Sequence, residues 1–468
     1  MAMVDTLVPG VSTLTSLVRY YSLYWALADL AEERGFDAAS CRVVLRRAEV
    51  AVAETAIAGG AAKLAHGTDK ITSLRNRGAT GDVAAAGTDS YSPRAWGFWD
   101  QYNGPNVIIG TVSVDGGALR SGRHTCPSAV RSLFRPMLEL VADRPARNSD
   151  IASFASMKWA DDDTPDLEPL TDLFTATRGG QHVPDDWTGN DLTRRATLRI
   201  LVRSAQLNPD ATGWSSALRQ AVAYGDLINT DPVLASEERA QAWRGVLFRH
   251  HSVGAWRRLW ARLVNQVVDA RGSFTRGDLH EWATAAVPPG TVREFVDSLP
   301  DAVDRAGNPL PAEETVRADG DDTGSDVALL LLGALRLDQL EGRSRAAFLG
   351  RAHGRRQFLD PHWVKFRRDD HADRPMAELA RVFVDDMLAQ SRRVALRKLR
   401  VDSNGQMTLF TKLHERNGRY FADQREGAGN ASLRIVQLGG MAEQLGLASS
   451  LFGMRVRQRA VDLLALPA

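Results

Sequence analysis

The residue types that could do chemistry gather in the last quarter of the chain. Between residues 351 and 468, Lys and Arg outnumber Asp and Glu by 21 to 13. Because guanidinium groups bind phosphates bidentately and aromatic rings stack on bases, this segment predicts a surface for a polyanion such as DNA. A helix that places cations in its last turns to match its dipole would give the same pattern, and this alternative stays open. The cations are Arg355 and Arg356, then Lys365, Arg367 and Arg368, then Arg393, Arg397, Lys398 and Arg400, with Phe358, Trp363 and Phe366 between them.

A second basic stretch covers residues 249–271. Its apolar residues recur at helical spacing and predict one buried face. Arg257 and Arg258 fall on the opposite face, which could follow a phosphate backbone or could be a solvated face with salt bridges. His250 and His251 are adjacent and therefore point in different directions on a helix, so they are a poor pair of metal ligands.

No catalytic motif accompanies these cations. The sequence has no GxxxxGK[ST] phosphate loop, no GxGxxG after a strand, no GxSxG elbow and no HExxH. Asp360, Asp369, Asp370 and His371 could gather around a metal ion, but neighbouring arginines favour ion pairs instead. We therefore expect no catalytic residues, no bound metal and no cofactor.

The composition limits the class of protein. With 58 basic and 57 acidic residues among 468, the chain as a whole is not a polycation, so any nucleic-acid surface must be local. Of the basic residues 52 are Arg, which fits either bidentate phosphate recognition or the codon usage of a GC-rich genome. Cys41 and Cys126 lack CxxC partners, and no apolar run is long enough to cross a membrane. The expected location is the cytoplasm.

The elements that position these residues are expected to be helices. Residues 7–35 give the strongest local signal, because Ser12 or Thr13 can cap a helix that is apolar over most of its circumference and should be buried. Arg19 lies within this helix, where it either ties two elements together or faces a phosphate. Residues 37–57 predict a second helix, with Arg46 and Glu49 on its polar face.

A Gly-rich loop and a hairpin are expected next. Residues 59–100 are rich in Gly, Ala, Ser and Thr and predict a long loop with at most short helical turns. An aromatic cluster that includes Trp96 and Trp99 closes the loop and could anchor it on the core or stack bases. The β-branched residues 107–114, followed by Asp115-Gly116-Gly117, predict a strand and a small hairpin near 105–120.

The fold class is expected to be mainly α, an array of helical bundles with one small β-hairpin. Further helices are predicted at 128–143, 192–206, 215–224, 236–248, 275–287, 291–299 and 326–341. Composition predicts an N-terminal helical domain at 1–145, a central helical domain at 146–300, an acidic linker or exposed crossing at 301–326, and a basic C-terminal domain at 327–468.

The last domain has features of a winged helix. Asn417-Gly418 predicts a type I′ turn between two strands within residues 407–421, and a helix is expected at 432–447. A two-stranded ribbon beside a helix indicates a winged-helix-like end of the chain.

The N-terminal segment resembles a known group of proteins. The residues that carry the likeness are Pro9, Gly10, Ser12, Thr13, Arg19, Tyr20, Tyr21 and Trp25, followed by Ser92-Pro93 and Trp96-Gly97. Their order is similar to that in uncharacterised, large helical bacterial proteins encoded in phage-defence or DNA-modification gene neighbourhoods, over about the first 130 residues. The resemblance implies a setting and no catalytic residues. Within this segment, Arg19, Tyr20, Trp25, Trp96 and Trp99 are the residues expected to serve the structure or to contact partners.

These observations predict a non-enzymatic, α-helical subunit of a bacterial antiviral-defence or DNA-processing complex. It would contact other subunits of that system through aromatic-rich helices and double-stranded DNA through the basic C-terminal third, with no membrane and no small-molecule cofactor. A metal-dependent nuclease whose carboxylates converge only in three dimensions is one alternative. A protein scaffold without a nucleic-acid role is the other.

Overall fold

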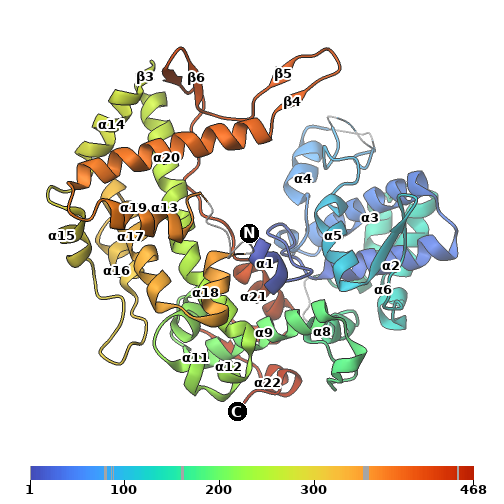
Figure 1. The fold of residues 1–468 in the computed structure, drawn as a ribbon. Helices are drawn as coiled ribbons and strands as arrows, with labels where there is room; N and C mark the ends of the chain where they lie inside the picture. The colour runs from blue at the N-terminus through green and yellow to red at the C-terminus, as the bar shows by residue number, and fades with distance from the viewer. Residues whose placement is uncertain are drawn as a thin grey trace. The chain divides into compact units, whose positions relative to one another are not determined.

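The computed structural model describes residues 2–78, 82–85, 87, 89–159, 163–350, 358–450 and 453–467. The described chain is mainly helical with short antiparallel strand pairs (Figure 1), which confirms the expected fold class. It packs as two compact units: unit 1 is Met1–Met3 with Arg219–Ser432, and unit 2 is Val4–Leu218 with Leu433–Ala468. The unit boundaries lie near residues 218 and 432, whereas composition predicted boundaries near 145, 300 and 326. Composition follows local solvation, but a compact unit is defined by contacts between distant segments.

Unit 2 is formed by both ends of the chain. Before the insertion of unit 1 its elements are α1 (Ala2–Leu7), α2 (Arg19–Glu33), α3 (Ala38–Ala58), η1 (Ala62–Leu64), α4 (Thr68–Asn76), α5 (Trp99–Ile109), β1 (Val112–Asp115), β2 (Ala118–Ser121), α6 (Ser128–Asp143), α7 (Asn148–Ile151), η2 (Ala152–Met157), α8 (Leu167–Thr175), η3 (Pro184–Asp186), α9 (Gly189–Leu207) and α10 (Trp214–Leu218). After the insertion they are α21 (Ile435–Gln444), β8 (Ala448–Ser449), β9 (Arg455–Val456) and α22 (Gln458–Leu464).

Helix α2 lies at the centre of unit 2, as its all-round apolar pattern predicts. It packs against α6 and β2 and is buried along most of its length. The helix begins at Arg19 and not at Ser12 or Thr13, because Ser12 and Thr15 hydrogen-bond each other in a turn. Side chains of Ser and Thr that bond nearby backbone in this way compete with helix formation. The second predicted helix is confirmed as α3, which Asp37 caps by accepting the Ser40 N–H at 2.7 Å.

The expected small hairpin is formed by β1 and β2, with Asp115 paired to Ala118 at its end. The strand begins later than predicted, because Val107 and its β-branched neighbours are the last turn of α5. Gly110, with φ +91°, ends that helix and lets the chain turn into β1. Tertiary context has overridden the β propensity of this stretch.

Unit 1 is one continuous segment. Its elements are η4 (Arg219–Ala223), α11 (Leu227–Thr230), α12 (Pro232–Ser236), α13 (Glu238–Asp269), β3 (Phe274–Thr275), α14 (Arg276–Ala285), α15 (Val292–Asp297), α16 (Ala312–Asp319), α17 (Thr323–Gln339), α18 (Gly342–Leu349), α19 (Pro361–Asp370), α20 (Met376–Arg397), β4 (Arg400–Val401), β5 (Met407–Thr408), β6 (His414–Arg416) and β7 (Arg419–Phe421).

The core of unit 1 lies between α13, α17 and α20, whose apolar residues include Leu259, Leu331 and Phe383. The two helices predicted at 236–248 and 249–271 are one long helix, α13. The acidic segment 301–326 carries α16, and its Glu313 makes a buried salt bridge with Arg336 of α17 at 2.9 Å. This segment therefore contributes to the core of unit 1, because a buried arginine needs a carboxylate partner.

The predicted ribbon near the C-terminus is present as β6 and β7. Asn417 and Gly418 both have positive φ, as a type I′ turn requires. The ribbon adds to β3 and belongs to unit 1, whereas α21 packs on α9 and α10 in unit 2. The ribbon and the helix therefore belong to different units, whereas the sequence predicted that they form one winged-helix-like part.

The described residues contain neither a candidate membrane span nor a candidate metal-ion site. No described helix combines the length and the apolar character that a membrane span needs. Within the same residues, no three His, Cys, Asp or Glu side chains lie close enough together to hold a metal ion.

Candidate nucleic-acid interface

Unit 1 carries the predicted DNA-facing cations. Arg355 and Arg356 lie outside the described residues. The others are placed on four elements: Arg257 and Arg258 on α13; Lys365, Arg367 and Arg368 on α19; Arg393 and Arg397 at the end of α20, followed by Lys398; and Arg400 in β4.

The spacing of Arg393, Arg397 and Arg400 predicts one helical face, but Arg400 lies outside the helix. Helix α20 ends at Arg397, and Arg400 pairs with Thr408 in the β4–β5 hairpin. The sequence that follows α20 prefers a strand, because Val401 is β-branched and the intervening turn contains Gly405 at φ +77°. Arg400 nevertheless follows directly from the end of that helix.

The cations of α19 are neutralised by carboxylates within unit 1. Each of them has an acidic partner at hydrogen-bond distance, and the Arg367 pair is bidentate. Surface pairs of this kind leave little net charge to attract phosphate. The pairs are Lys365 with Asp338 at 2.6 Å, Arg367 with Asp386 at 2.9 Å and Arg368 with Asp369 at 2.8 Å.

The basic face of α13 is only partly neutralised by carboxylates. Arg258 lies 2.7 Å from Asp326, which is fully buried at the start of α17, and Arg262 also reaches this carboxylate. Arg257 is exposed and has no carboxylate partner among the described residues. Burial lowers the pKa of His250 to about 4 and that of His251 to about 3, so neither ring adds charge at pH 7.

The end of α20 and the start of β4 retain their positive charge. Here five exposed cations follow one another, and none of them pairs with a carboxylate in the part of the chain that the structure describes. We call these five cations and Arg257 the basic patch. The five are Arg392, Arg393, Arg397, Lys398 and Arg400.

Two arginines of the basic patch lie over aromatic rings. The Arg393 guanidinium carbon is 5.0 Å from the centre of the Phe358 ring, and that of Arg400 is 5.3 Å from the Phe410 ring. Stacking of this kind orients the plane of a guanidinium group and leaves its N–H edge open to an acceptor. Sequence analysis had noted Phe358 among the interleaved aromatics but not Phe410.

An aromatic pocket of about 320 Å³ adjoins the basic patch. Trp256 and Trp260 of α13, Val394 of α20 and Phe410 form its apolar walls, and Lys398 lies at its lining. An apolar cavity with aromatic walls beside cations suits an unstacked base. Both tryptophans belong to the apolar face that the spacing in residues 249–271 predicts to be buried, so the pocket was not predicted. The i, i+4 spacing of Trp256 and Trp260 around Arg257 was the available signal.

The β4–β5 hairpin exposes apolar side chains next to these cations. Figure 1 shows the hairpin extending beyond the end of α20. Val401 is 60% exposed and Met407 is 69% exposed, and neither is covered within the described chain. Apolar side chains on a basic projection can insert between base steps and unstack them.

The aromatic residues of the N-terminal motif are structural. Tyr20 is buried and its hydroxyl accepts the His66 N–H at 2.9 Å, while Trp25 donates from Nε1 to the His124 carbonyl at 3.0 Å. Trp99 is also buried, and Trp96 is half-buried. Partner proteins therefore cannot reach Tyr20, Trp25 or Trp99 without unfolding of unit 2.

Arg19 is the tie between elements that its burial predicts. Its Nε lies 3.1 Å from the carboxylate of buried Asp166, and its Nη2 donates to the Met157 carbonyl at 2.9 Å. The guanidinium also lies over the Trp159 ring, 4.5 Å from its centre. This set of partners satisfies the arginine without a phosphate.

The acidic residues considered for a metal have other roles. Asp360 caps α19 by accepting the Trp363 N–H at 2.8 Å, and Asp369 pairs with Arg368. His371 lies 3.2 Å from Asp370. Among these contacts, the pair of Asp369 with Arg368 is the one ion pair with an arginine that the described residues show.

The fold and this surface together define a mainly α-helical protein with a local cationic, aromatic face. Comparisons with known protein families, with curated proteins and with solved structures find no match to the chain.

Proposed function

We propose that the protein is a non-enzymatic, nucleic-acid-binding subunit of a bacterial antiviral-defence or DNA-processing complex. One observation carries the proposal: exposed cations on α20 and β4 have no acidic partners within the described chain, although acids neutralise the basic residues of α19 nearby. DNA backbone phosphates are the counterions that such a surface fits.

The physical cost of the basic patch supports this interpretation. Arg393 and Arg397 are spaced i, i+4 on one helix, where like charges repel by a few tenths of a kcal/mol. A surface without a function loses nothing if one of them becomes neutral or acidic. An anion that bridges both residues converts the repulsion into two charge-assisted hydrogen bonds.

The aromatic pocket and the exposed hairpin favour a nucleic acid over a small anion. Trp260 and Phe410 offer faces on which bases can stack, and Met407 projects beside the phosphate-binding cations. The protein would therefore bind double-stranded DNA at the basic patch. The pocket and the hairpin would partly unstack the bases of this duplex. The setting in a defence or DNA-processing complex, with other subunits as partners, is the one that the N-terminal resemblance implies.

Charge reversal of Arg393, Arg397 and Arg400 to Glu tests the proposal. We expect weaker binding of a fluorescent duplex and, because up to three phosphate contacts are lost, a slope of log K against log salt that is smaller by about 2 to 3. The measurement is fluorescence anisotropy over a salt titration with wild type and variant. The matched control reverses Arg42, Arg77 and Arg94, three exposed arginines of unit 2.

Two outcomes would count against the proposal. Equal affinities and equal salt slopes for wild type and the patch variant would leave a protein scaffold as the better interpretation. Magnesium-dependent nicking of a plasmid by the purified protein would contradict the non-enzymatic part and favour the nuclease.

A further inference from the structure

Unit 2 contains a pocket that the proposed function does not use. It has a volume of about 610 Å³, within the range of roughly 300–1,000 Å³ that is usual for small-molecule sites. Its walls come from α3, α4, residues 82–84 and residues 144–148. Four of the lining residues are arginines, and we call it the arginine pocket. These are Arg47, Arg75, Arg144 and Arg147.

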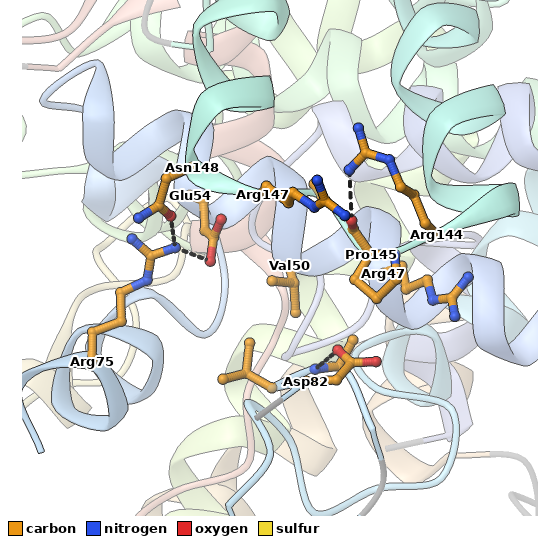
Figure 2. A pocket seen from close by; sticks show the side chains of 12 residues that line it. Arg47, Val50, Glu54, Arg75, Asp82, Arg144, Pro145, Arg147 and Asn148 are labelled. Atoms are coloured by element: carbon orange, nitrogen blue, oxygen red, sulfur yellow. Dashed lines mark hydrogen bonds and ion pairs between the residues drawn. The ribbon is translucent and has the colours of Figure 1, made fainter. Parts of the chain in front are cut away.

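Figure 2 shows how these side chains surround the pocket. Arg75 lies on one side with Glu54 and Asn148, and the other arginines lie on the opposite side. Val50 of α3 lies between the two groups. The arginines thus line the pocket from α3, from α4 and from residues 144–148. Salt bridges along the surface of a single helix would not bring them together in this way.

The structural contacts of Arg75 use only part of its donor capacity. Its Nη2 donates to Glu54 and, at 2.8 Å, to the Asn148 side chain. Both described hydrogen bonds come from this one nitrogen, so Nε and Nη1 remain for an acceptor in the pocket. Glu54 and Asn148 hold the guanidinium in place without saturating it.

Arg144 is held by a salt bridge with a carboxylate outside the pocket lining. It makes a bidentate salt bridge with Asp150 at 2.6 and 2.8 Å and lowers the pKa of that carboxyl to about 2, so the pair stays ionised at neutral pH. Asp150 also accepts the backbone N–H of Arg147 at 2.7 Å. These bonds fix the loop from which both arginines project.

Arg47 and Arg147 have donors with no described partner. Arg47 donates from Nη1 to the Val141 carbonyl at 3.1 Å, but its Nε is buried and has no hydrogen-bond partner in the described chain. The side chain of Arg147 makes no hydrogen bond or ion pair with any described residue. The exposed guanidinium of Arg147 is therefore available to an acceptor in the pocket.

Charge leaves the pocket cationic. Four arginines face two lining carboxylates, Glu54 and Asp82, and Glu54 is already paired with Arg75. Asp82 accepts the Ala84 N–H at 2.9 Å. The remaining walls are aliphatic, from Val50, Val83 and Pro145. A cavity with convergent guanidinium groups and an aliphatic floor fits a compact polyanion with an attached organic group.

We propose that the arginine pocket binds a small molecule that carries a di- or triphosphate. Arg147 and Arg75 contact phosphate oxygens, the Arg47 guanidinium adds positive charge to the wall, and Val50 and Val83 pack against the organic part. Arg144 is a positioning residue, because its guanidinium is engaged with Asp150 and it orders the loop that carries Arg147.

Isothermal titration calorimetry with pyrophosphate and with ATP tests this proposal on the full-length protein. Adenosine is the uncharged arm of the experiment. We expect both polyphosphates to bind, ATP the more tightly, and adenosine alone not to bind. The variant Arg147→Glu lowers the affinity for polyphosphate at least about tenfold, since it replaces an exposed cationic donor with a carboxylate that repels the phosphates. Arg42→Glu on α3, which does not line the pocket, is the matched control.

A second variant keeps the test decisive if Arg147→Glu disturbs the loop. Asp82→Asn removes a negative charge from the lining but retains an acceptor for the Ala84 N–H, so we expect about threefold or greater gain in pyrophosphate affinity. Absence of heat with pyrophosphate and ATP at millimolar concentration overturns the proposal. Equal affinity of wild type, Arg147→Glu and Asp82→Asn also overturns it, because binding would then lie elsewhere.

The test is separate from that of the nucleic-acid interface. The variant with Arg393, Arg397 and Arg400 reversed should retain pyrophosphate affinity within about twofold, and Arg147→Glu should retain DNA affinity. If the patch variant alone lost pyrophosphate binding, polyphosphate would be binding at the basic patch and the arginine pocket would not be the site.

Discussion

Glu49 is a carboxylic acid enclosed by aromatic residues inside unit 2. It accepts hydrogen bonds from the hydroxyl groups of Tyr24, at 2.5 Å, and Tyr91, and from the backbone N–H groups of Phe98 and Trp99 at 2.9 and 3.1 Å. Burial is the largest influence and raises the pKa of Glu49 to about 7, although each of these donors lowers it. The carboxyl group therefore titrates near neutral pH.

This shift predicts a pH-dependent stability. The folded pKa of Glu49 is raised from its usual 4.5 to about 7, so its contribution is complete below pH 4.5 and is lost as the pH rises through 7. We expect the unfolding free energy of wild type to fall by roughly 2 to 3 kcal/mol more than that of Glu49→Gln between pH 5 and pH 8. Urea denaturation at each pH measures the difference.

The exposed Glu281→Gln is the control and should leave the pH profile of wild type unchanged. Parallel pH profiles of wild type and Glu49→Gln would show that Glu49 stays ionised in the folded state over this range. In that case the four donors outweigh burial.

Some contacts of single residues could be predicted from the sequence and others could not. The need of a buried arginine for a carboxylate predicted the role of Arg19, but its partner Asp166 is 147 positions away and local patterns cannot identify it. Helical periodicity placed Glu49 and Arg46 on a polar face of α3, yet both are buried. The segment after α4 folds over this face, and Arg46 donates to its carbonyl groups at Ala84 and Ser92.

At the scale of elements, Asp326 joins α17 to α13. Its carboxylate is fully buried and lies 2.7 Å from Arg258 and 3.3 Å from Arg262. Asp321, three-fifths exposed, pairs with Arg262 at 2.7 Å from the segment before α17. The two aspartates make similar contacts in different environments, so they separate the effect of burial from that of pairing.

Replacement of Asp326 should therefore cost far more than replacement of Asp321. Asp326→Ala leaves two half-buried guanidinium groups without their buried partner, and we expect a loss of about 3–5 kcal/mol in unfolding free energy. Asp321→Ala breaks exposed pairs with Arg262 and Arg317 and should cost less than about 1 kcal/mol. Chemical denaturation of both variants measures the difference, and equal losses would show that the α13–α17 contact does not depend on this carboxylate.

Most elements could be predicted from periodicity, but only some of their ends could. The helix expected at 128–143 is α6 with the same bounds, because its apolar stripe is regular and Pro127 precedes it. The end of α20 could not be read from Arg393, Arg397 and Arg400, since three arginines at helical spacing look the same whether the last belongs to a helix or to the strand that follows. The arginine pocket depends on segments remote in sequence, and the aromatic pocket had only the spacing of Trp256 and Trp260 as a local signal.

The whole molecule combines near neutrality with local charge. A net charge of +1 over 468 residues conceals the basic patch in unit 1 and the arginine pocket in unit 2. In both places arginines lack sufficient acidic partners within the described chain, whereas other exposed arginines, such as Arg276 and Arg293, pair with aspartates at 2.6 and 2.8 Å. Arginine abundance from codon usage explains the number of these residues but not this selective absence of partners.

The division into two units predicts how ligands affect thermal unfolding of the full chain. Each unit has its own buried core, so we expect calorimetry to resolve two transitions, of which Asp326→Ala lowers the one that belongs to unit 1. A ligand at 100 times its Kd adds about 2.7 kcal/mol to the unit that binds it, which for units of this size raises the midpoint by roughly 5–10 °C. Duplex DNA should raise the transition that Asp326→Ala lowers, and pyrophosphate should raise the other. If both ligands raised the same transition, one of the two sites would be misplaced, and the patch and Arg147→Glu variants would identify which, because only the variant at the true site abolishes the shift.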